Sequence, residues 1–298
     1  ASTADVAVLL IDARYGLQEQ SRRHAYIVSL FGVKRVVLAI NKMDLNNFDQ
    51  GVFNAIEVDF RKFSENLGFL DITCIPISAL NGDNITTLSS RSKWYKGPSL
   101  LDFLEHIDVD QNTFEAPFRL PVQWVNRPNL DFRGFSGTIT SGIINVGDSI
   151  TVSPSGKCSK VKEIVTHGGN LKSACENMAI TLTLEDQIDI SRGDMISTSD
   201  SPTAQADQFQ AHILWMNEKE LFPGRQYLLK TTNKTVLASI SNLKYKVDIN
   251  DFSEVAVKTL GLNEIGVATL VLSAPIAYDA YSDNRKTGSI IIIDRQTN

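Results

Sequence analysis

The stretch that decides the fold is Arg35-Val36-Val37-Leu38-Ala39-Ile40-Asn41-Lys42-Met43-Asp44. Residues 35–40 form an apolar run after their first residue, which is typical of a buried strand in a parallel sheet. The polar group that follows is suited to reading guanine, because the carboxylate of Asp44 can accept both donors on one edge of that base. Adenine lacks this pair of donors, and a site built around a polar group rejects such an analogue by roughly 10⁴–10⁵. The pattern predicts a guanine-binding loop at the end of a buried strand.

The other residues of the group have separate expected roles. Asn41 can tie neighbouring loops together and direct its amide at the base, and the stem of Lys42 can lie along the base plane. Met43 is expected only to pack in the core. Because the group is short, a surface turn followed by the start of a helix remains an open alternative for it.

A second loop strengthens the prediction. Residues 72–77 form another apolar run, and Ser78-Ala79-Leu80 follows it. In GTP-binding folds the end of such a second strand supplies a backbone N–H to the guanine carbonyl oxygen, and the small side chain of Ala79 would let the backbone approach. We therefore expect Asn41, Lys42, Asp44, Ser78, Ala79 and Leu80 to form the guanine-binding site.

Composition limits the possible classes of protein. The chain has 298 residues, of which 43% are hydrophobic and 21% charged, as in ordinary globular proteins. A net charge of −5 argues against nucleic acid as a partner. The sequence contains no apolar run of about 18 residues, the length that a membrane-spanning helix needs. Cys74, Cys158 and Cys175 show neither disulfide nor metal-ligand spacing. We expect a cytoplasmic protein without a metal site in this chain.

The phosphate-binding motif of GTP sites is absent from these residues. No G-x-x-x-x-G-K-[S/T] occurs, since Gly156-Lys157 lacks the spaced glycine and Lys172-Ser173 follows a leucine. The chain also begins without a methionine and runs at once into an apolar strand. We interpret it as the base-reading half of a GTP site, N-terminally incomplete and with no catalytic residue in this span.

The order of predicted elements indicates a multidomain protein with an α/β part followed by two all-β parts. Within residues 1–112, strands at 6–11, 35–40 and 72–77 alternate with helices at 18–32, 53–67 and 99–107, the pattern of a parallel α/β domain. After a polar linker at residues 108–112, short alternating runs separated by turn residues predict β-barrels at 113–203 and 204–298. One of these runs, 120–125, is expected to be a single strand.

This organisation resembles the translational-GTPase superfamily, as a partial P-loop GTPase domain followed by two β-barrels. Within it, the sequence is similar to the family of large, GTP-binding subunits of bacterial ATP sulfurylase. The resemblance covers nearly the whole chain. The motifs that carry it are Asp12-Ala13-Arg14, Arg22-Arg23-His24, Asn41-Lys42-Met43-Asp44-Leu45, Ile77-Ser78-Ala79-Leu80, Asp189-Ile190-Ser191-Arg192-Gly193-Asp194, Tyr245-Lys246-Val247-Asp248-Ile249-Asn250 and the long stretch Pro121-Val122-Gln123-Trp124-Val125-Asn126-Arg127-Pro128-Asn129-Leu130-Asp131-Phe132-Arg133-Gly134.

The resemblance implies a function. In this family a small catalytic subunit is thought to join sulfate to ATP, and GTP hydrolysis by the large subunit is coupled to that uphill reaction. The guanine-contacting roles carry over to the six residues named above, whereas the phosphate and Mg²⁺ ligands would fall upstream of Ala1. Two other classes remain open, a translation elongation factor that carries aminoacyl-tRNA and a scaffold with a degenerate nucleotide site.

The loop at residues 126–134 is a further candidate surface. Arg127, Asp131 and Arg133 alternate there with Pro128 and Phe132. The loop is expected either to contact the nucleotide domain or the small subunit, or to be a solvated loop braced by an internal pair of arginine and carboxylate. Exposed pairs of that kind contribute roughly 0–1 kcal/mol, so stability alone is a weak reason for them.

The missing phosphate motif leads to a first prediction. The 298 residues alone should bind GTP weakly and hydrolyse none, because each charge-assisted phosphate hydrogen bond that they lack is worth roughly 1.5–3 kcal/mol. Phosphate release from GTP by the isolated chain, measured against a blank without protein, checks this. Turnover above the blank would refute it.

Overall fold

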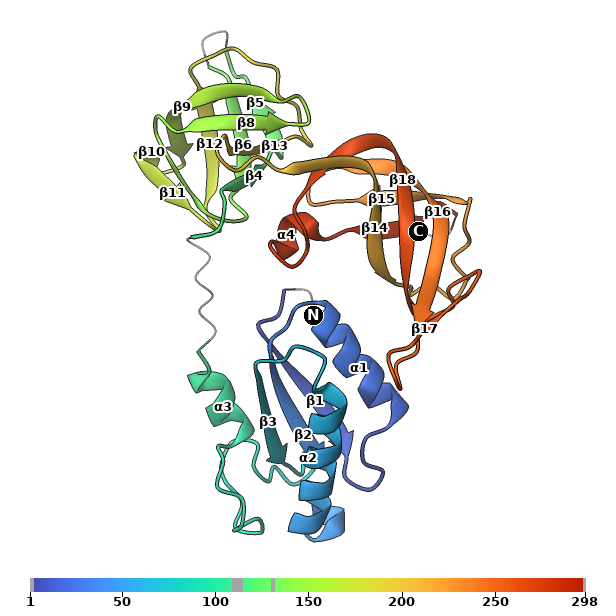
Figure 1. Cartoon of the computed structure of the whole chain (residues 1–298). Helices are drawn as coiled ribbons and strands as arrows, with labels where there is room; N and C mark the ends of the chain where they lie inside the picture. The colour runs from blue at the N-terminus through green and yellow to red at the C-terminus, as the bar shows by residue number, and fades with distance from the viewer. Residues whose placement is uncertain (1–2, 109–114, 130–131, 297–298) are drawn as a thin grey trace. The chain divides into compact units, whose positions relative to one another are not determined.

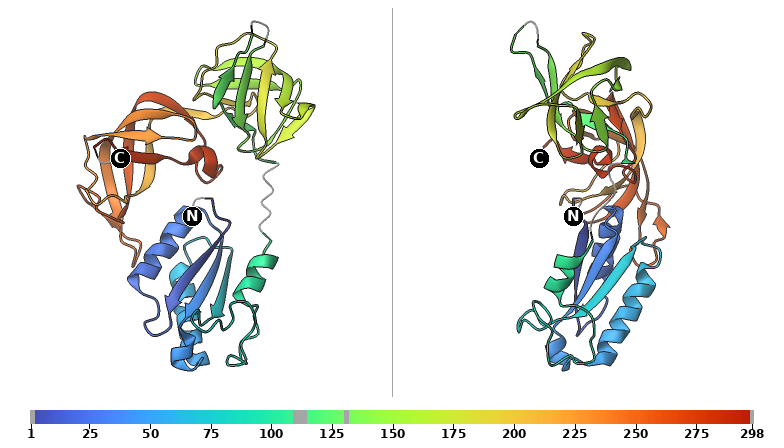
Figure 2. Two further views of the ribbon diagram at one scale, coloured as in Figure 1. Left: turned by 180° about the vertical axis from the view of Figure 1, so that it is seen from behind. Right: turned by 90° about the vertical axis from the view of Figure 1, so that its left-hand side faces the viewer.

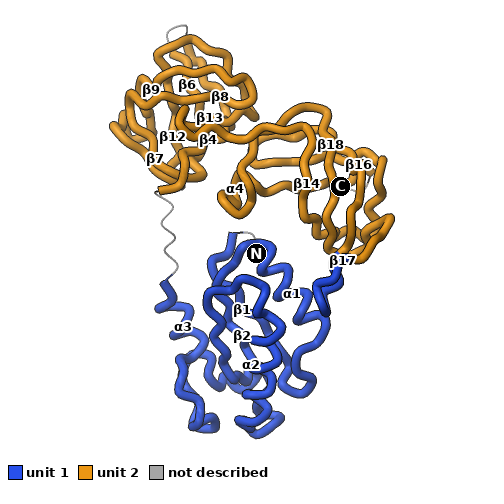
Figure 3. Tube along the Cα trace, in the orientation of Figure 1, with its two compact units in different colours: residues 1–110, 247–254 blue, residues 111–246, 255–298 orange. Residues whose placement is uncertain are grey.

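The computed structural model describes residues 3–108, 115–129 and 132–296. Figure 3 shows the two compact units of the chain, residues 1–110 with 247–254 and residues 111–246 with 255–298. The linker predicted at residues 108–112 lies mostly outside the described residues. The domain limits predicted from the sequence, 1–112, 113–203 and 204–298, therefore stay predictions.

The first unit is built on a parallel sheet of three strands in the order β1-β2-β3. The strands are β1 (Val6–Asp12), β2 (Arg35–Asn41) and β3 (Asp71–Pro76). Asp12 lies opposite Asn41, and Ile40 lies opposite Pro76. The carboxyl ends of the three strands consequently meet at one edge of the sheet.

Helices cover both faces of this sheet, as Figures 1 and 2 show. On one face, α1 (Glu19–Leu30) and α2 (Gln50–Ser64) share a core with β1 and β2. On the other face, α3 (Leu100–His106) packs against β2 and β3 through Leu100 and Phe103. The apolar side of α2 consists of buried residues at helical spacing, Phe53, Ile56, Phe60 and Phe63.

Side-chain caps begin two of these helices. Asp49 accepts a hydrogen bond from the Val52 N–H at 3.0 Å before α2, and Ser99 accepts one from the Asp102 N–H at 3.3 Å before α3. Such caps satisfy backbone donors that the first helical turn leaves unpaired. The α/β pattern predicted from the sequence is thus confirmed, with the ends of the elements shifted by a few residues.

A segment distant in sequence completes the first unit. Residues 247–254 follow a strand of the last β domain but belong to this unit. The Phe252 ring lies 5.4 Å from the Tyr26 ring on α1 and 5.3 Å from the Phe63 ring on α2, centroid to centroid. Aromatic contacts at such spacing add stability beyond the area they bury.

The second unit begins with an antiparallel sheet of eight strands. Backbone hydrogen bonds from Arg119 N to Ser141 O (3.1 Å) and from Thr140 N to Arg119 O (2.9 Å) join its two sides around a core of apolar side chains. Its strands are β4 (Arg119–Pro121), β5 (Trp124–Asn126), β6 (Gly134–Thr138), β8 (Ser149–Ser153), β9 (Lys157–Thr166), β10 (Gly169–Leu171), β12 (Ala179–Leu184) and β13 (Met195–Thr198), with the hairpin of β7 (Ile143–Asn145) and β11 (Ser173–Cys175) beside it.

A second antiparallel sheet follows, in the order β14-β18-β16-β15-β19 with β17 beside β16. The sheet curls, as Figure 1 shows, and it encloses an apolar core of its own. Its elements are β14 (Ala204–Leu214), β15 (Gln226–Lys230), β16 (Thr235–Val247), β17 (Glu254–Val255), β18 (Ile265–Tyr278), α4 (Arg285–Gly288) and β19 (Ile291–Asp294). Two all-β parts after an α/β part are the fold class predicted from the sequence. No helix of the described residues has the length and apolar character needed to cross a membrane.

One local expectation was wrong, and one short helix was not foreseen. Residues 120–125 do not form one strand, because Val122 N donates to Asp194 O at 2.9 Å and Gln123 N to Ser136 O at 2.9 Å, which redirects the chain between β4 and β5. The helix α4 was not predicted. It is short, and its start depends on the Asn284 side chain, which accepts from the N–H groups of Lys286 and Thr287.

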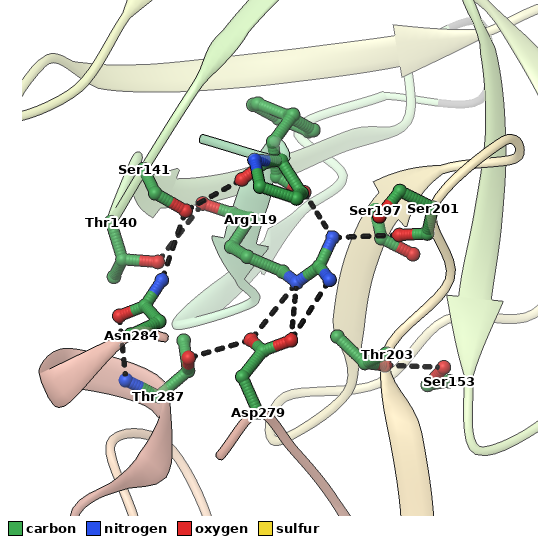
Figure 4. Close-up of polar contacts among 12 residues, drawn as sticks. Arg119, Thr140, Ser141, Ser153, Ser197, Ser201, Thr203, Asp279, Asn284 and Thr287 are labelled. Carbon is green, nitrogen blue, oxygen red and sulfur yellow. Dashed lines mark hydrogen bonds and ion pairs between the residues drawn. The ribbon is translucent and has the colours of Figure 1, made fainter. Parts of the chain in front are cut away.

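A buried ion pair joins the two β domains within the second unit, as Figure 4 shows. The Arg119 guanidinium donates from Nε and Nη2 to the Asp279 carboxylate at 2.8–3.0 Å. Its Nη1 donates to the carbonyl oxygen of Ser201 at 2.7 Å, and the Thr287 hydroxyl donates to Asp279 at 2.7 Å. The side chain of Arg119 is only 5% exposed, so this pair is shielded from solvent screening.

Breaking this pair should destabilise the second unit strongly. Arg119→Ala leaves the Asp279 carboxylate buried without its cation, which typically costs about 3–5 kcal/mol. Urea denaturation followed by circular dichroism measures the loss. Arg23→Ala is the matched control, because Arg23 pairs with Glu19 on the surface of α1, where such pairs contribute about 0.3–0.5 kcal/mol. Equal shifts for the two variants would contradict the prediction.

Candidate nucleotide-binding site

The two loops expected to read guanine leave the same edge of the parallel sheet. β2 ends at Asn41 and its neighbour β3 ends at Pro76. The Ile77 N–H then donates to the Ile40 carbonyl at 2.8 Å, and the Met43 N–H donates to the Ile77 carbonyl at 3.2 Å. These bonds hold the two loops side by side beyond the sheet.

Asn41 ties the loops together through its side chain. Its Oδ1 accepts a hydrogen bond from the Lys42 N–H at 2.7 Å and another from the Ala79 N–H at 3.0 Å. This is the bridging role expected for it. Its side-chain NH₂ group makes no hydrogen bond to another described residue, so that donor faces no competing partner within residues 3–108.

Lys42 adopts a backbone conformation that is uncommon outside glycine. Its φ is +64° and its ψ is +28°, in the left-handed region. Its side chain is 45% exposed, and the ammonium lies 2.9 Å from Oδ2 of Asp12 at the end of β1. The stem of Lys42 therefore crosses the edge of the sheet from β2 toward β1.

Asp44 lies in a short 3₁₀ helix, η1 (Met43–Asn46), which starts the connection to α2. Its side chain is partly exposed and forms neither a hydrogen bond nor an ion pair with any residue that the structure describes. Met43, in contrast, is completely buried in the core under α1 and α2, which confirms its packing role. The carboxylate of Asp44 thus has its acceptor capacity available for a ligand.

Hydrogen bonds hold the second loop, and its three residues differ in role. Ser78 is fully buried, its N–H donates to the Asp83 carbonyl at 3.2 Å, and its hydroxyl accepts from the Asn81 N–H at 3.3 Å. Its side chain therefore shapes the loop. The Ala79 N–H is already used by Asn41, so it is not available to a base. Leu80 is 90% exposed beside these groups.

The polar segment after this loop braces it, and sequence reasoning missed this role. Asn84 is fully buried with φ at +56°. Its Nδ2 donates to the Pro76 carbonyl at 2.7 Å and to the Ser92 hydroxyl at 2.9 Å, and its Oδ1 accepts from the Ser89 N–H at 2.7 Å. Ser89 and Ser92 are thereby explained as partners of one buried amide.

Phe48 connects the same segment to the loop of Asp44. The Arg91 guanidinium lies 4.9 Å from the centre of the Phe48 ring, and the Trp94 indole N–H donates to the Phe48 carbonyl at 2.8 Å. Residues 84–94 therefore contact both loops, at Pro76 before the second loop and at Phe48 after the first. No sequence signal indicated this, because the contacts join residues more than forty positions apart.

Asp12 is a further residue at this edge that was not among the predicted site residues. The Arg14 guanidinium and the Lys42 ammonium both donate to it, and they hold the pKa of the Asp12 carboxyl well below its usual range against the opposing effect of burial. Its place could have been read from the sequence, because a charged residue at the end of the neighbouring parallel strand must lie at the same edge.

The described residues contain no group of three or more His, Cys, Asp or Glu side chains that could hold a metal ion. At the edge of the sheet the described residues provide the unpaired carboxylate of Asp44, the amide donor of Asn41 and the exposed side chain of Leu80. Their contact with a base stays a prediction.

Comparison with known proteins shows which families this chain is similar to. Residues 1–108 match the family "Elongation factor Tu GTP binding domain", and residues 208–298 match "GTP-eEF1A C-terminal domain-like". The crystal structure of Sup35 complexed with GDP superposes with a TM-score of 0.58 and 22% identity, covering 99% of this chain and 76% of that one, which establishes a shared fold.

Curated relatives are more similar in sequence. "Sulfate adenylyltransferase subunit 1" of Aliarcobacter butzleri (strain RM4018) is 54% identical over all of this chain and 64% of its own length. The same subunit of Teredinibacter turnerae is 48% identical, again over 64% of its length. "Bifunctional enzyme NodQ" of Rhizobium sp. (strain N33) is 49% identical over 46% of its length. This chain thus spans about half to two thirds of these relatives. With its elongation-factor GTP-binding and C-terminal domain matches, it belongs to the translational-GTPase superfamily.

Proposed function

We propose that this chain is part of a GTP-binding regulatory subunit of sulfate adenylyltransferase. In this proposal a small catalytic partner subunit forms adenylyl sulfate from ATP and sulfate, and GTP hydrolysis by the complete protein is coupled to that reaction. The observation that carries the proposal is the carboxylate of Asp44, which lies partly exposed and unpaired among the described residues at the edge braced by Asn41.

The chemistry of this edge fits guanine. An ionised carboxylate can only accept hydrogen bonds, and guanine offers it two donors in parallel. The exposed Leu80 and the half-exposed stem of Lys42 provide apolar surface beside it. Covering a leucine side chain completely is worth roughly 1.5–3 kcal/mol, and a flat base would regain part of that. These features support Asn41, Lys42, Asp44 and Leu80 as base-contacting residues, with Ser78 shaping the loop. Ala79, whose N–H is taken by Asn41, would contact the base only through its small side chain.

The phosphates of GTP and their Mg²⁺ need other residues. The sequence lacks the phosphate-binding motif, and the described residues offer no set of metal ligands. No step through Mg²⁺ is therefore assigned to this chain. We propose that both are bound by parts of the protein outside these 298 residues, since the curated relatives are longer.

The remaining parts of the proposal concern place and partner. The name "subunit 1" of the relatives supports a second subunit in the complex. Free cysteines at positions 74, 158 and 175 support a reducing cytoplasm. A carrier of aminoacyl-tRNA is not favoured, because the relatives at 47–54% identity are sulfate-activating or NodQ proteins and the net charge is −5.

The role of Asp44 leads to a prediction on nucleotide preference. In the full-length protein, Asp44→Asn should shift binding from GTP toward xanthosine triphosphate, because the amide can donate a hydrogen bond where the carboxylate only accepts. In a complex with the small subunit, the nucleotide that supports adenylyl sulfate synthesis should change in the same way. The control is Asp59→Asn on the exposed side of α2. Retained GTP selectivity in the Asp44 variant would count against the site.

A binding experiment separates the proposal from its competitor. We expect the protein to retain no charged tRNA on a nitrocellulose filter at about 0.15 M salt, where proteins that neutralise many phosphates still bind their specific nucleic acid. Elongation factor Tu with GTP serves as the positive control. Tight binding that weakens steeply with added salt would favour the carrier function instead.

A further inference from the structure

One charged cluster at the edge of the sheet is not used by the proposed contacts with guanine. Asp12 lies at the end of β1, opposite Asn41 in the parallel register, and the Ala13 N–H donates to the Asn41 carbonyl at 2.9 Å. The Asp12 carboxylate therefore has a fixed place beside the loop that carries Lys42 and Asp44.

Two cations share this carboxylate. Arg14 donates to it from its backbone N–H at 3.0 Å, from Nε at 3.0 Å and from Nη2 at 2.7 Å. The Lys42 ammonium lies 2.9 Å from the same Oδ2 that Nη2 of Arg14 contacts. The side chain of Asp12 is 23% exposed, so these interactions are partly shielded from water.

The position of Lys42 matters for Asp44, which is only two residues further along the chain. An ammonium on a flexible stem can pair with any carboxylate within reach. A pair between Lys42 and Asp44 would occupy the acceptor oxygens that guanine needs. In the structure Lys42 is instead directed to Asp12, and Asp44 has no partner among the described residues.

On the basis of guanine reading by Asp44 as proposed above, we propose that Asp12 is a positioning residue for base selectivity. It holds the ammonium of Lys42 at the end of β1 and thereby keeps the carboxylate of Asp44 free to accept both donors of guanine. Arg14 also pairs with Asp12, at both carboxylate oxygens, but it is Asp12 that holds Lys42.

The ratio of GDP to IDP affinity reports this role. Inosine diphosphate lacks the exocyclic amine, so the ratio measures the second hydrogen bond to Asp44. A hydrogen bond to a charged group corresponds to about tenfold to a hundredfold in affinity. The substitution Asp12→Asn removes the negative charge that holds Lys42. The ratio of GDP to IDP affinity should then fall by about tenfold, because Lys42 pairs with Asp44 instead. Calorimetric titration of the full-length protein with each diphosphate measures it.

Removing the ammonium should restore selectivity. In the double variant Asp12→Asn with Lys42→Met there is no cation left to occupy Asp44, so the ratio should return to within about threefold of its original value, even if both affinities are lower. Arg14→Met is the matched control, because it disturbs the same cluster but leaves Lys42 paired with Asp12, and it should keep the ratio.

These outcomes separate a positioning role from a merely structural one. If Asp12 only stabilised the end of β1, the affinities for GDP and IDP would fall together and Lys42→Met would restore nothing. An unchanged ratio in Asp12→Asn, or no rescue in the double variant, would overturn the inference. Should Asp12→Asn fail to fold, Asp12→Ser provides the test, because it also removes the charge that holds Lys42 and must lower the ratio.

The failure of the guanine proposal itself would be recognised differently. In that case the unaltered protein would show no preference for GDP over IDP, and Asp44→Asn would leave both affinities unchanged. A clear preference in the unaltered protein that does not respond to Asp12→Asn would refute only the role of Asp12.

Discussion

The parallel register of β1, β2 and β3 is the constraint on which the rest of the nucleotide-binding unit depends. Because the three strands run the same way and end level with one another, Asp12, Asn41 and Pro76 reach one edge of the sheet. A shift of the register would move Asn41 out of reach of the Ala79 N–H and Lys42 out of reach of Asp12. Polar side chains at that edge can act together only because buried apolar strands fix them there.

The two kinds of domain use buried polar groups in different ways. In the first unit Asn84 is a neutral hub that holds two loops through hydrogen bonds, with no charge to desolvate. In the second unit Arg119 and Asp279 form a buried ion pair between two all-β domains. A buried ion pair contributes little net stability but penalises other arrangements strongly, since each charge needs the other. Here it ties the start of β4 to the segment that follows β18.

Much of the fold could be predicted from local patterns. The three strands and three helices of the α/β part were recognisable because buried strands are uniformly apolar and α2 carries apolar residues at helical spacing. The break between β4 and β5 was not recognisable, because it depends on a hydrogen bond from Val122 to Asp194, a partner distant in sequence. The helix α4 is too short to show any periodicity.

In the candidate site, too, local groups of residues could be predicted and contacts between distant segments could not. Asn41, Lys42 and Asp44 were identified because adjacent residues form a recognisable group. Asn84, Arg91 and Trp94 support the group from another segment, and nothing in their own sequence indicates a partner at Pro76 or Phe48. Residues that touch a ligand directly are constrained by its chemistry, whereas residues that brace them are constrained by packing alone, which many sequences can satisfy.

The aromatic contact of Phe252 has a consequence for how this protein can be dissected. Phe252 comes from a segment of the chain that follows more than a hundred residues of β structure, yet it packs on Tyr26 and Phe63. The α/β unit is thus discontinuous in sequence. A truncation after residue 110 would strip an aromatic side chain from its helices and leave two rings facing water, so such a fragment is a poor stand-in for the unit in the intact chain.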